Sequence, residues 1–253
     1  MNKEYLNYHF VFVNGLHRSG TSILYRILSA QQGFSGFSNT GVPEDEGQHL
    51  QSVYKPAKHY GGPGKFGFDN QSFLTEVSDL ISDKNREKLF VDWANHWNLS
   101  NKFLVEKSPP NIVRTRFLQE MFVNSSFVTI LRNPIAVSFA TQKWSKTSLD
   151  SLFKHWLICN ENYLEDAQFL KNSLSFKYEE FTSNPDKVLL KISDLLDAKL
   201  NLPNEWEIKQ GANEKYFEMW EKYKNSFWTK RKANKLIKKY EDAFNKFGYS
   251  LML

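Results

Sequence analysis

The sequence is poor in cysteine and contains no long apolar run. One cysteine, Cys159, occurs in 253 residues, so no intrachain disulfide can form and a reducing compartment fits. The first ten residues, MNKEYLNYHF, lack the apolar core of a signal peptide. No apolar stretch approaches the roughly 18 residues that a membrane-spanning helix needs. We therefore expect a cytoplasmic protein without a membrane span.

The excess of positive charge is small. The 33 Lys and Arg exceed the 28 Asp and Glu by five, which suits an anionic ligand but is too modest to indicate a nucleic-acid partner. Aromatic residues make up 15% of the chain and include 21 Phe, so we expect a core packed with rings. A chain of this length can bury one substantial core, and we expect a single domain over residues 1–253.

Four short, nearly continuous apolar runs predict strands buried on both faces, at 9–13, 102–107, 127–132 and 174–179. Helix-like segments lie at 21–30, 85–97, 110–122, 152–171 and 185–196. Strands that alternate with helices predict an α/β fold: a P-loop-type parallel β-sheet of about four to five strands, flanked by helices on both faces. The glycine-rich segment 60–70 is expected to be a loop, either a surface connection or a flap that gates substrate.

The segment NGLHRSGTS, residues 14–22, has the layout of a phosphate-binding loop without its lysine. Gly15 and Gly20 have the spacing of G-x-x-x-x-G-K-[ST], but Thr21 stands at the lysine position and Arg18 lies inside the loop. A turn bounded by glycines between a strand and a helix directs backbone N–H groups at one point, which suits a cluster of anionic oxygens. The sequence therefore predicts an anion site here.

A second feature separates the chain from nucleoside triphosphatases. In those enzymes the lysine reaches the β- and γ-phosphates, and an acidic residue on another strand supports magnesium. Here the strand 127–132 ends in Arg132. The ligand is expected to be bound by cations and amides, without a metal.

Five segments together resemble sulfotransferases that use 3′-phosphoadenosine 5′-phosphosulfate (PAPS). GLHRSGTS is similar to the 5′-phosphosulfate loop of that family, in which Lys or Arg precedes Ser-Gly-Thr. LRNPIAVSFATQKW (131–144) resembles its 3′-phosphate segment, and VEKSPPNIVRTRFL (105–118) the E-K-S-P or K-D-P block of the glycan and tyrosylprotein branches. YEEFTSNPDKVLLKISDLLD (178–197) matches the pattern Y-E-x-L…P…I…L, and KFGYSL (246–251) the usual ending.

The resemblance implies roles for the cations and hydroxyls of these segments. Sulfuryl transfer from PAPS, which leaves the desulfonated product PAP, needs positive charge around the sulfonate oxygens. By resemblance, Arg18 supplies charge at the 5′-phosphosulfate, and Lys107 reaches the sulfonate or the leaving oxygen. The hydrogen-bond donors expected at the 5′-phosphosulfate are Ser19, Gly20, Thr21 and Ser22.

Arg132 is expected to hold the 3′-phosphate, where the bidentate geometry of a guanidinium is favoured. The chain departs from the family pattern eight positions later, where Ala140 stands in place of a phosphate-binding serine. Ser138 and Thr141 flank that position, and we favour Ser138 as the substitute. Lys215 is a further expected cofactor-binding residue.

The run TKRKANKLIKK (229–239) fits two roles. The family often adds basic residues from a late loop to the 3′-phosphate site, and this run would supply them. A charged, solvated face of a helix is the alternative that its composition favours.

The acceptor hydroxyl needs a general base. The segment GVPEDEGQH (41–49) occupies the place where tyrosylprotein and glycan sulfotransferases carry their catalytic glutamate. Acids before a helix also serve as an ordinary helix start. We rank Glu44 over Glu46 as the base and place His49 third, and we expect His17 to be a packing residue.

The predicted function is transfer of a sulfonate from PAPS to a hydroxyl of a small-molecule, saccharide or peptide acceptor. A P-loop nucleotide kinase is the alternative, against which Thr21 and Arg132 argue because they replace a lysine and a metal-holding acid. A nucleotide-binding regulatory protein is a further alternative, because Ala140 breaks a family position. The sequence decides neither the acceptor nor the oligomeric state.

Overall fold

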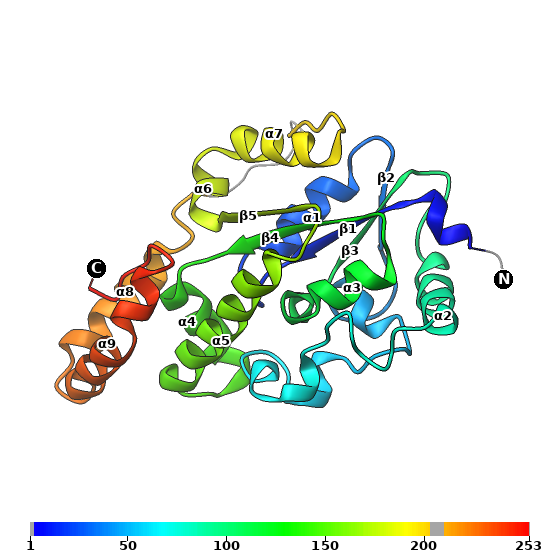
Figure 1. Cartoon of the computed structure of the whole chain (residues 1–253). Coiled ribbons are helices and arrows are strands. Elements are labelled where there is room, and N and C mark those ends of the chain that lie inside the picture. Colours follow the sequence, from blue (N-terminus) through cyan, green and yellow to red (C-terminus); the bar gives the residue numbers. More distant parts are fainter. Residues whose placement is uncertain (1–2, 203–209, 253) are drawn as a thin grey trace.

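Five parallel strands form the centre of the structure, a computed structural model that describes residues 3–202 and 210–252 (Figure 1). The order of the strands is β2-β3-β1-β4-β5. The strands are β1 (His9–Asn14), β2 (Phe34–Gly36), β3 (Phe103–Lys107), β4 (Ser125–Leu131) and β5 (Ser173–Lys177). The four strands expected from apolar runs are thereby confirmed. The edge strand β2, with the sequence FSG, is too short to produce such a run.

Helices cover both faces of this sheet, as expected (Figure 1). The α-helices are α1 (Thr21–Ser29), α2 (Asp83–Ala94), α3 (Thr115–Met121), α4 (Pro134–Ser145), α5 (Leu149–Ala167), α6 (Tyr178–Ser183), α7 (Pro185–Leu196), α8 (Glu214–Asn225) and α9 (Lys230–Asn245). Short 3₁₀ helices are η1 (Glu4–Asn7), η2 (Pro43–Asp45), η3 (Gly47–His49), η4 (Ala57–Tyr60), η5 (Phe66–Phe68), η6 (Asn70–Ser72) and η7 (Pro109–Val113). Among the described residues, no helix is long and apolar enough to span a bilayer.

The alternation of side chains along β1 explains the two layers. Val11 and Val13 belong to a core cluster with α1 and α7 on one face. Phe10 and Phe12 belong to a cluster with α2 and α3 on the other. Successive residues of a strand point to opposite faces, so one apolar run supplies both cores.

The register of the central strands brings three segments together at the carboxyl ends of the strands. Val13 of β1 pairs with Lys107 of β3, and Asn14 pairs with Thr129 of β4. The side-chain amide of Asn14 donates to the Thr129 hydroxyl across 3.3 Å. Because the strands are parallel, the residues that follow β1, β3 and β4 meet at the same end, where α/β sheets commonly bind ligands.

The helix expected over 110–122 is divided in two. The 3₁₀ helix η7 ends at Val113, and α3 begins at Thr115. Arg114 between them is non-helical and fully buried, and its guanidinium donates to the carbonyls of Ser72 and Lys55 at 3.0 Å each. These long-range bonds hold the chain in the break, which a local apolar pattern does not reveal.

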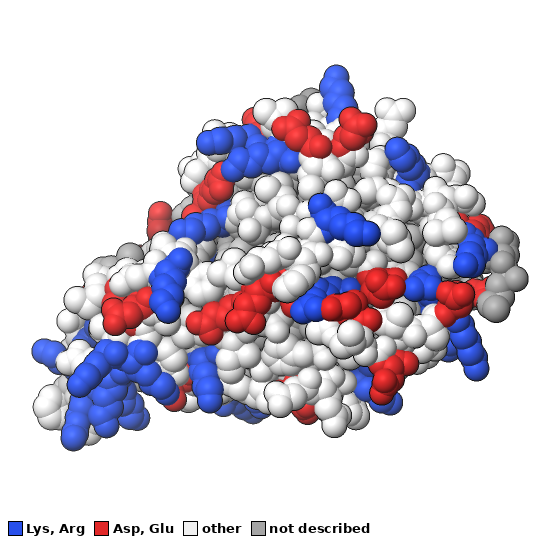
Figure 2. All heavy atoms as spheres, in the orientation of Figure 1, with Lys and Arg blue, Asp and Glu red and all other residues white. Residues whose placement is uncertain are grey.

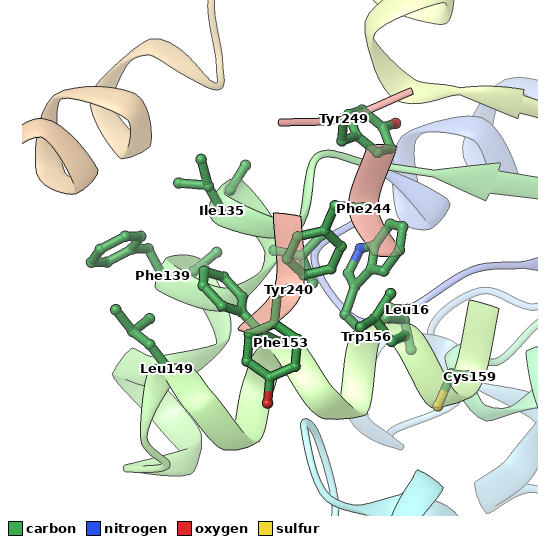
Figure 3. Packing of buried hydrophobic residues seen from close by; sticks show 14 of the residues in the cluster. Leu16, Ile135, Phe139, Leu149, Phe153, Trp156, Cys159, Tyr240, Phe244 and Tyr249 are labelled. Atoms are coloured by element: carbon green, nitrogen blue, oxygen red, sulfur yellow. The ribbon is translucent and has the colours of Figure 1, made fainter. Parts of the chain in front are cut away.

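The C-terminal helices α8 and α9 pack on α4 and α5, beyond the carboxyl ends of the strands (Figure 1). The Trp156 indole of α5 lies in this core and meets Phe244 edge-on at a centroid distance of 5.4 Å (Figure 3). Its N–H donates to the Arg132 carbonyl at 3.0 Å. The aromatic core therefore fixes the backbone that follows β4.

The segment 60–70 is a loop that contains the short helix η5, as expected. It is more than a surface connection, because Phe66 is fully buried. The Phe66 ring lies 4.7 Å from the ring of His155 and 5.9 Å from that of His17, measured between centroids. This loop thus packs against the β1–α1 junction.

Candidate active site

Two glycines let the β1–α1 loop pass close to its neighbours. Gly15 has φ +141°, and a Cβ there would lie 2.5 Å from the Ile130 carbonyl oxygen. Gly20 has φ +102°, and its Cβ would lie 2.6 Å from a ring carbon of Tyr178. Larger residues would be strained at both positions and would collide. The loop is therefore packed into a defined shape against β4 and Tyr178.

The amino terminus of α1 is open for an anion. The helix begins at Thr21, and its N-cap residue Gly20 has no side chain with which to cap it. The first N–H groups of a helix have no carbonyl partner within it, and they carry the positive end of the helix dipole. Ser19 is almost fully buried beside them, and the Ser22 hydroxyl donates to the Glu44 carboxylate at 3.2 Å. This is the donor set that suits a phosphate or sulfonate.

Arg18 lies in the middle of this loop with its side chain exposed. Its backbone has φ +72°, an uncommon conformation for a residue other than glycine. The guanidinium carbon lies 4.6 Å from the ring centroid of Trp144, and the Arg18 carbonyl accepts a 2.7 Å hydrogen bond from Arg132. The backbone of the loop at Arg18 is thereby bonded to the side chain that follows β4.

Lys107 at the end of β3 forms a buried ion pair with Glu46. The Lys107 ammonium lies 3.1 Å from a carboxylate oxygen of Glu46 and donates to the Glu44 carbonyl at 3.1 Å. The side chains of Lys107 and Glu46 are 1% and 7% exposed. Burial raises the pKa of Glu46, and the charge of Lys107 opposes that rise. Two of the predicted catalytic residues therefore lie together at a fixed separation.

Glu44 differs from Glu46 in its surroundings. It is exposed and has φ +55° within η2. Its carboxylate accepts from Ser22, so it lies at the start of α1. A carboxylate here can be reached by an incoming molecule, whereas Glu46 is engaged by Lys107 and by the side-chain amide of Gln48. His49 is half-buried, and burial lowers its pKa.

A buried acid, Glu106, lies next to Lys107 in β3 and connects that strand to the segment that carries Gln48. Glu106, next to Lys107, accepts from the Ser108 hydroxyl at 2.6 Å and from the Asn111 amide. The Ser108 oxygen in turn accepts from the Gln48 backbone N–H at 2.9 Å. Burial raises the pKa of Glu106 to about 7. Sequence reasoning gave this residue no role, although it opens the E-K-S-P block.

Arg132 is held by three protein oxygens. Its guanidinium donates to the Asn213 side chain at 2.8 Å, to the Arg18 carbonyl at 2.7 Å and to the Ala212 carbonyl at 3.2 Å. The guanidinium carbon stacks 4.1 Å from the Tyr178 ring centroid. An arginine has more N–H groups than these three bonds use, so donors remain for a ligand.

Glu179 ties together the segments around Arg132, and sequence reasoning missed it. It accepts from the Asn213 side chain at 2.6 Å, from the Asn133 backbone N–H at 3.1 Å and from the Tyr249 hydroxyl at 3.0 Å. The only sequence feature that could have indicated Glu179 is its place as the acidic residue of the Y-E pattern at 178–179. Because its partners lie far apart in the sequence, no local pattern predicts the network.

Ser138 lies in a small cavity behind the β1–α1 loop. The hydroxyls of Ser138 and Thr141 and the Nδ1 atom of His17 are buried without a protein hydrogen-bond partner. They line a cavity of about 10 Å³ with His155, and Arg132 is not part of its lining. That volume is about the space of one water molecule. Burial lowers the pKa of His17 to about 3, in accord with a packing role.

The remaining predicted cofactor residue, Lys215, is exposed at the start of α8. It lies two residues after Asn213, the partner of Arg132, and its ammonium is 4.9 Å from the Tyr216 ring centroid. The basic run 229–239 forms most of α9. None of the hydrogen bonds or ion pairs found in 3–202 and 210–252 joins α9 to Arg18, Lys107 or Arg132.

A model of the sulfotransferase family matches residues 11–201. The chain belongs to the sulfotransferase family. The match includes most of β1, the loop, η2, the end of β3 and the end of β4, which are elements that converge at the site. This sulfotransferase is a transferase enzyme that moves a sulfonate group, and the kinase alternative is set aside.

Solved structures share the fold. The sulfotransferase domain from the curacin biosynthetic pathway is 16% identical, with a TM-score of 0.54, over 90% of this chain and 97% of that one. The sulfotransferase domain from the Synechococcus PCC 7002 olefin synthase is 18% identical, with a TM-score of 0.50, over 77% and 75% of the two chains. Sulfotransferase STF1 from Mycobacterium tuberculosis H37Rv is 12% identical, with a TM-score of 0.50, over 79% and 71%. No curated protein matches the chain.

Proposed function

We propose that this sulfotransferase takes its sulfonate from PAPS and passes it to a hydroxyl of an acceptor, leaving PAP. The observation that carries the proposal is the meeting of Arg18, Lys107 and Arg132 at the ends of three adjacent strands, beside the uncapped amino terminus of α1. Cations and amides of this kind match the several anionic groups of a nucleotide phosphosulfate. The residues present therefore fit the group.

The proposed binding roles rest on the positions of the side chains and of the α1 amides. The α1 amides, with Ser19, Gly20, Thr21 and Ser22, hold the 5′-phosphosulfate, and Arg18 adds charge there. The unused N–H groups of Arg132 hold the 3′-phosphate. Ser138 and Lys215 are proposed to assist at that phosphate. The Ser138 hydroxyl has no protein partner to give up, and it lies in the cavity beside His17, whose lining does not include Arg132.

The proposed catalytic roles rest on the exposure of Glu44 and on the buried charge of Lys107. PAPS supplies the sulfonate that is transferred. Glu44 accepts the proton of the acceptor hydroxyl at its carboxylate, as a new bond forms between that hydroxyl oxygen and sulfur. Lys107 donates a hydrogen bond to the oxygen that leaves sulfur and offsets its growing negative charge. Glu46 keeps the Lys107 ammonium in place and is a positioning residue.

We take residues 1–253 as one sulfotransferase domain, because α8 and α9, which lie beyond the family match, share a core with α4 and α5. The acceptor is a small molecule, a saccharide or a peptide that carries a hydroxyl. A reducing, cytoplasmic location and metal-independent binding also belong to the proposal, supported by the single cysteine and by the cationic ligand set.

Calorimetric titration with PAP in EDTA tests this function, with ATP and magnesium as the matched comparison. We expect PAP to bind without metal and magnesium to leave its affinity unchanged. A protein that binds ATP with magnesium and does not bind PAP would contradict the proposal. Transfer of radiolabelled sulfonate from PAPS to a panel of phenols, saccharides and peptides then identifies the acceptor class.

A further inference from the structure

The helix α9 presents a cationic face that the active site does not use. Its buried side chains are Ala233, Leu236, Tyr240 and Phe244. At helical spacing, Arg231, Lys235 and Lys238 lie on the opposite side, where they are exposed. Figure 2 shows Lys and Arg side chains gathered at the end of the molecule where Figure 1 draws α9. Among the described residues these three cations form no ion pair.

Two large apolar side chains protrude directly before this helix. Phe227 and Trp228, in the α8–α9 turn, are 89% and 83% exposed, the highest values for large apolar side chains among the described residues. Their rings contact each other edge to face at 5.4 Å. The turn is fixed from within, because the Thr229 hydroxyl donates to the Tyr223 carbonyl at 2.6 Å. Exposing two adjacent aromatic rings to water is unfavourable in free energy, and a contiguous exposed apolar patch often marks an interaction site.

A groove of about 560 Å³ begins beside the same turn. Tyr223, Leu149 and Leu236 contribute apolar surface to it, and Lys232, Lys235 and Lys239 supply its cations. Lys239 pairs with Asp150 at 2.7 Å, which leaves the groove a net positive charge. An apolar surface lined by ammonium groups suits a molecule that has both an acyl chain and an anionic head.

We infer that this corner docks on the surface of an anionic phospholipid bilayer. The corner consists of Phe227, Trp228, Arg231, Lys232, Lys235, Lys238 and Lys239. Stable peripheral attachment needs two signals, and the corner has an apolar anchor and a basic patch side by side. The two rings enter the headgroup boundary, while the cations bind lipid phosphates. A nucleic acid would use the cations but not the apolar surface of the groove, so the bilayer is the better match.

Vesicle co-sedimentation tests the inference on the full-length protein. We expect it to bind vesicles of equal parts phosphatidylglycerol and phosphatidylcholine, not to bind pure phosphatidylcholine, and to lose binding as salt rises. The variant Phe227→Ser/Trp228→Ser should lose about tenfold in affinity through the missing anchor. The variant Arg231→Glu/Lys235→Glu/Lys238→Glu should lose at least as much.

Control variants make changes of the same kind elsewhere on the surface. Val77→Ser removes an apolar side chain that is 80% exposed, and Lys84→Glu/Lys187→Glu reverses two exposed cations; both should bind vesicles like the wild type. Melting curves by circular dichroism confirm that each variant is folded. No binding to the anionic vesicles, equal losses in the corner and control variants, or binding of a single-stranded oligonucleotide in place of vesicles would each overturn the inference.

Discussion

The two cationic regions of this molecule differ in what surrounds the charge. At the strand ends, Lys107 is 1% exposed and is fixed by Glu46 and a carbonyl, and Arg132 donates to three oxygens. On α9, Lys235 and Lys238 face solvent. A buried, hydrogen-bonded cation has one position and acts through a low dielectric, whereas an exposed one is screened by water and salt. Burial and fixed hydrogen bonds therefore distinguish Lys107 and Arg132 from the cations of α9, whereas the exposed Arg18 resembles the α9 cations in this respect.

This comparison predicts that changes at the strand ends affect chemistry or cofactor binding, and that changes on α9 do not. The largest effect is expected for Glu44→Gln. The variant keeps the shape of the site but has no base for the acceptor proton, so turnover should fall about 10²–10⁴-fold while PAP affinity stays nearly constant. Steady-state kinetics and calorimetry with PAP measure the two quantities.

Glu46→Gln is the internal control for that assignment. Its side chain is buried against Lys107, so we expect a smaller loss of turnover that arises from a misplaced ammonium. If Glu46→Gln were inactive and Glu44→Gln fully active, the general base would be Glu46 and not Glu44. If neither acid mattered, His49 would become the base.

Lys107→Met should lower turnover by about 10²–10³-fold, because it removes the charge beside the leaving oxygen. It should also destabilise the fold by about 3–5 kcal/mol, since Glu46 is left buried without its partner. The double variant Lys107→Met/Glu46→Gln separates the two effects: stability should recover and turnover should not. Recovery of turnover in the double variant would show that Lys107 acts only on the fold.

The buried acid Glu106 gives a prediction about pH. Burial raises its pKa from 4.5 to about 7, so between these values the folded protein keeps a proton that the unfolded chain releases. The stability from this group is complete below the lower value and is lost as pH rises through the higher one. The free energy of unfolding of Glu106→Gln should therefore rise by about 2.5 kcal/mol relative to that of the wild type between about pH 5 and pH 8. Denaturant titrations at both pH values measure it, and a constant difference would place the pKa elsewhere.

Arg132→Ala tests the end of β4. Loss of a charge-assisted hydrogen bond should weaken PAPS by about ten- to a hundredfold, and adenosine 5′-phosphosulfate by less, because that ligand has no 3′-phosphate. Lys215→Ala is the comparison for an exposed cation near the same site. Equal weakening of both ligands by Arg132→Ala would assign the guanidinium to another group.

The smallest effect is expected on α9. Lys235→Glu/Lys238→Glu should leave PAP affinity and turnover in vesicle-free solution within about twofold of the wild type, because exposed charges far from a ligand are screened. The same assays as for Arg132→Ala apply. A loss of PAP affinity comparable with that of Arg132→Ala would contradict the distinction between the two regions. It would instead support a role of the basic run 229–239 in binding the 3′-phosphate.

Much of the fold and part of the site could be predicted from local patterns. Apolar runs identified β1, β3, β4 and β5, and the helix expected at 185–196 has those limits as α7. Arg18 and the loop around it followed from glycine spacing and from the strand–turn–helix context. The pattern failed at Arg114, where contacts with residues tens of positions away interrupt a helix that the apolar spacing favoured.

The remaining site residues depended on pairing between distant segments. Glu179 and Asn213 lie more than thirty positions apart along the chain, yet they share a hydrogen bond and both fix the surroundings of Arg132. Glu106 reads as one polar residue in an apolar strand, and its partner network crosses to Gln48 through Ser108. Such bonds form only after the sheet has placed the segments together.

The sequence by itself determined four of the five strands, the glycines of the loop, the cations at the strand ends and the family, because these depend on residue type and short spacing. Only the tertiary structure decided which acid is paired and which is exposed. Glu44 and Glu46 lie two residues apart in one acidic segment, but the Lys107 ammonium reaches Glu46 from β3 and leaves the carboxylate of Glu44 to Ser22 and to solvent. Burial and partner are properties of the assembled sheet, so the difference between the buried, paired Glu46 and the exposed Glu44 could not be predicted from the sequence.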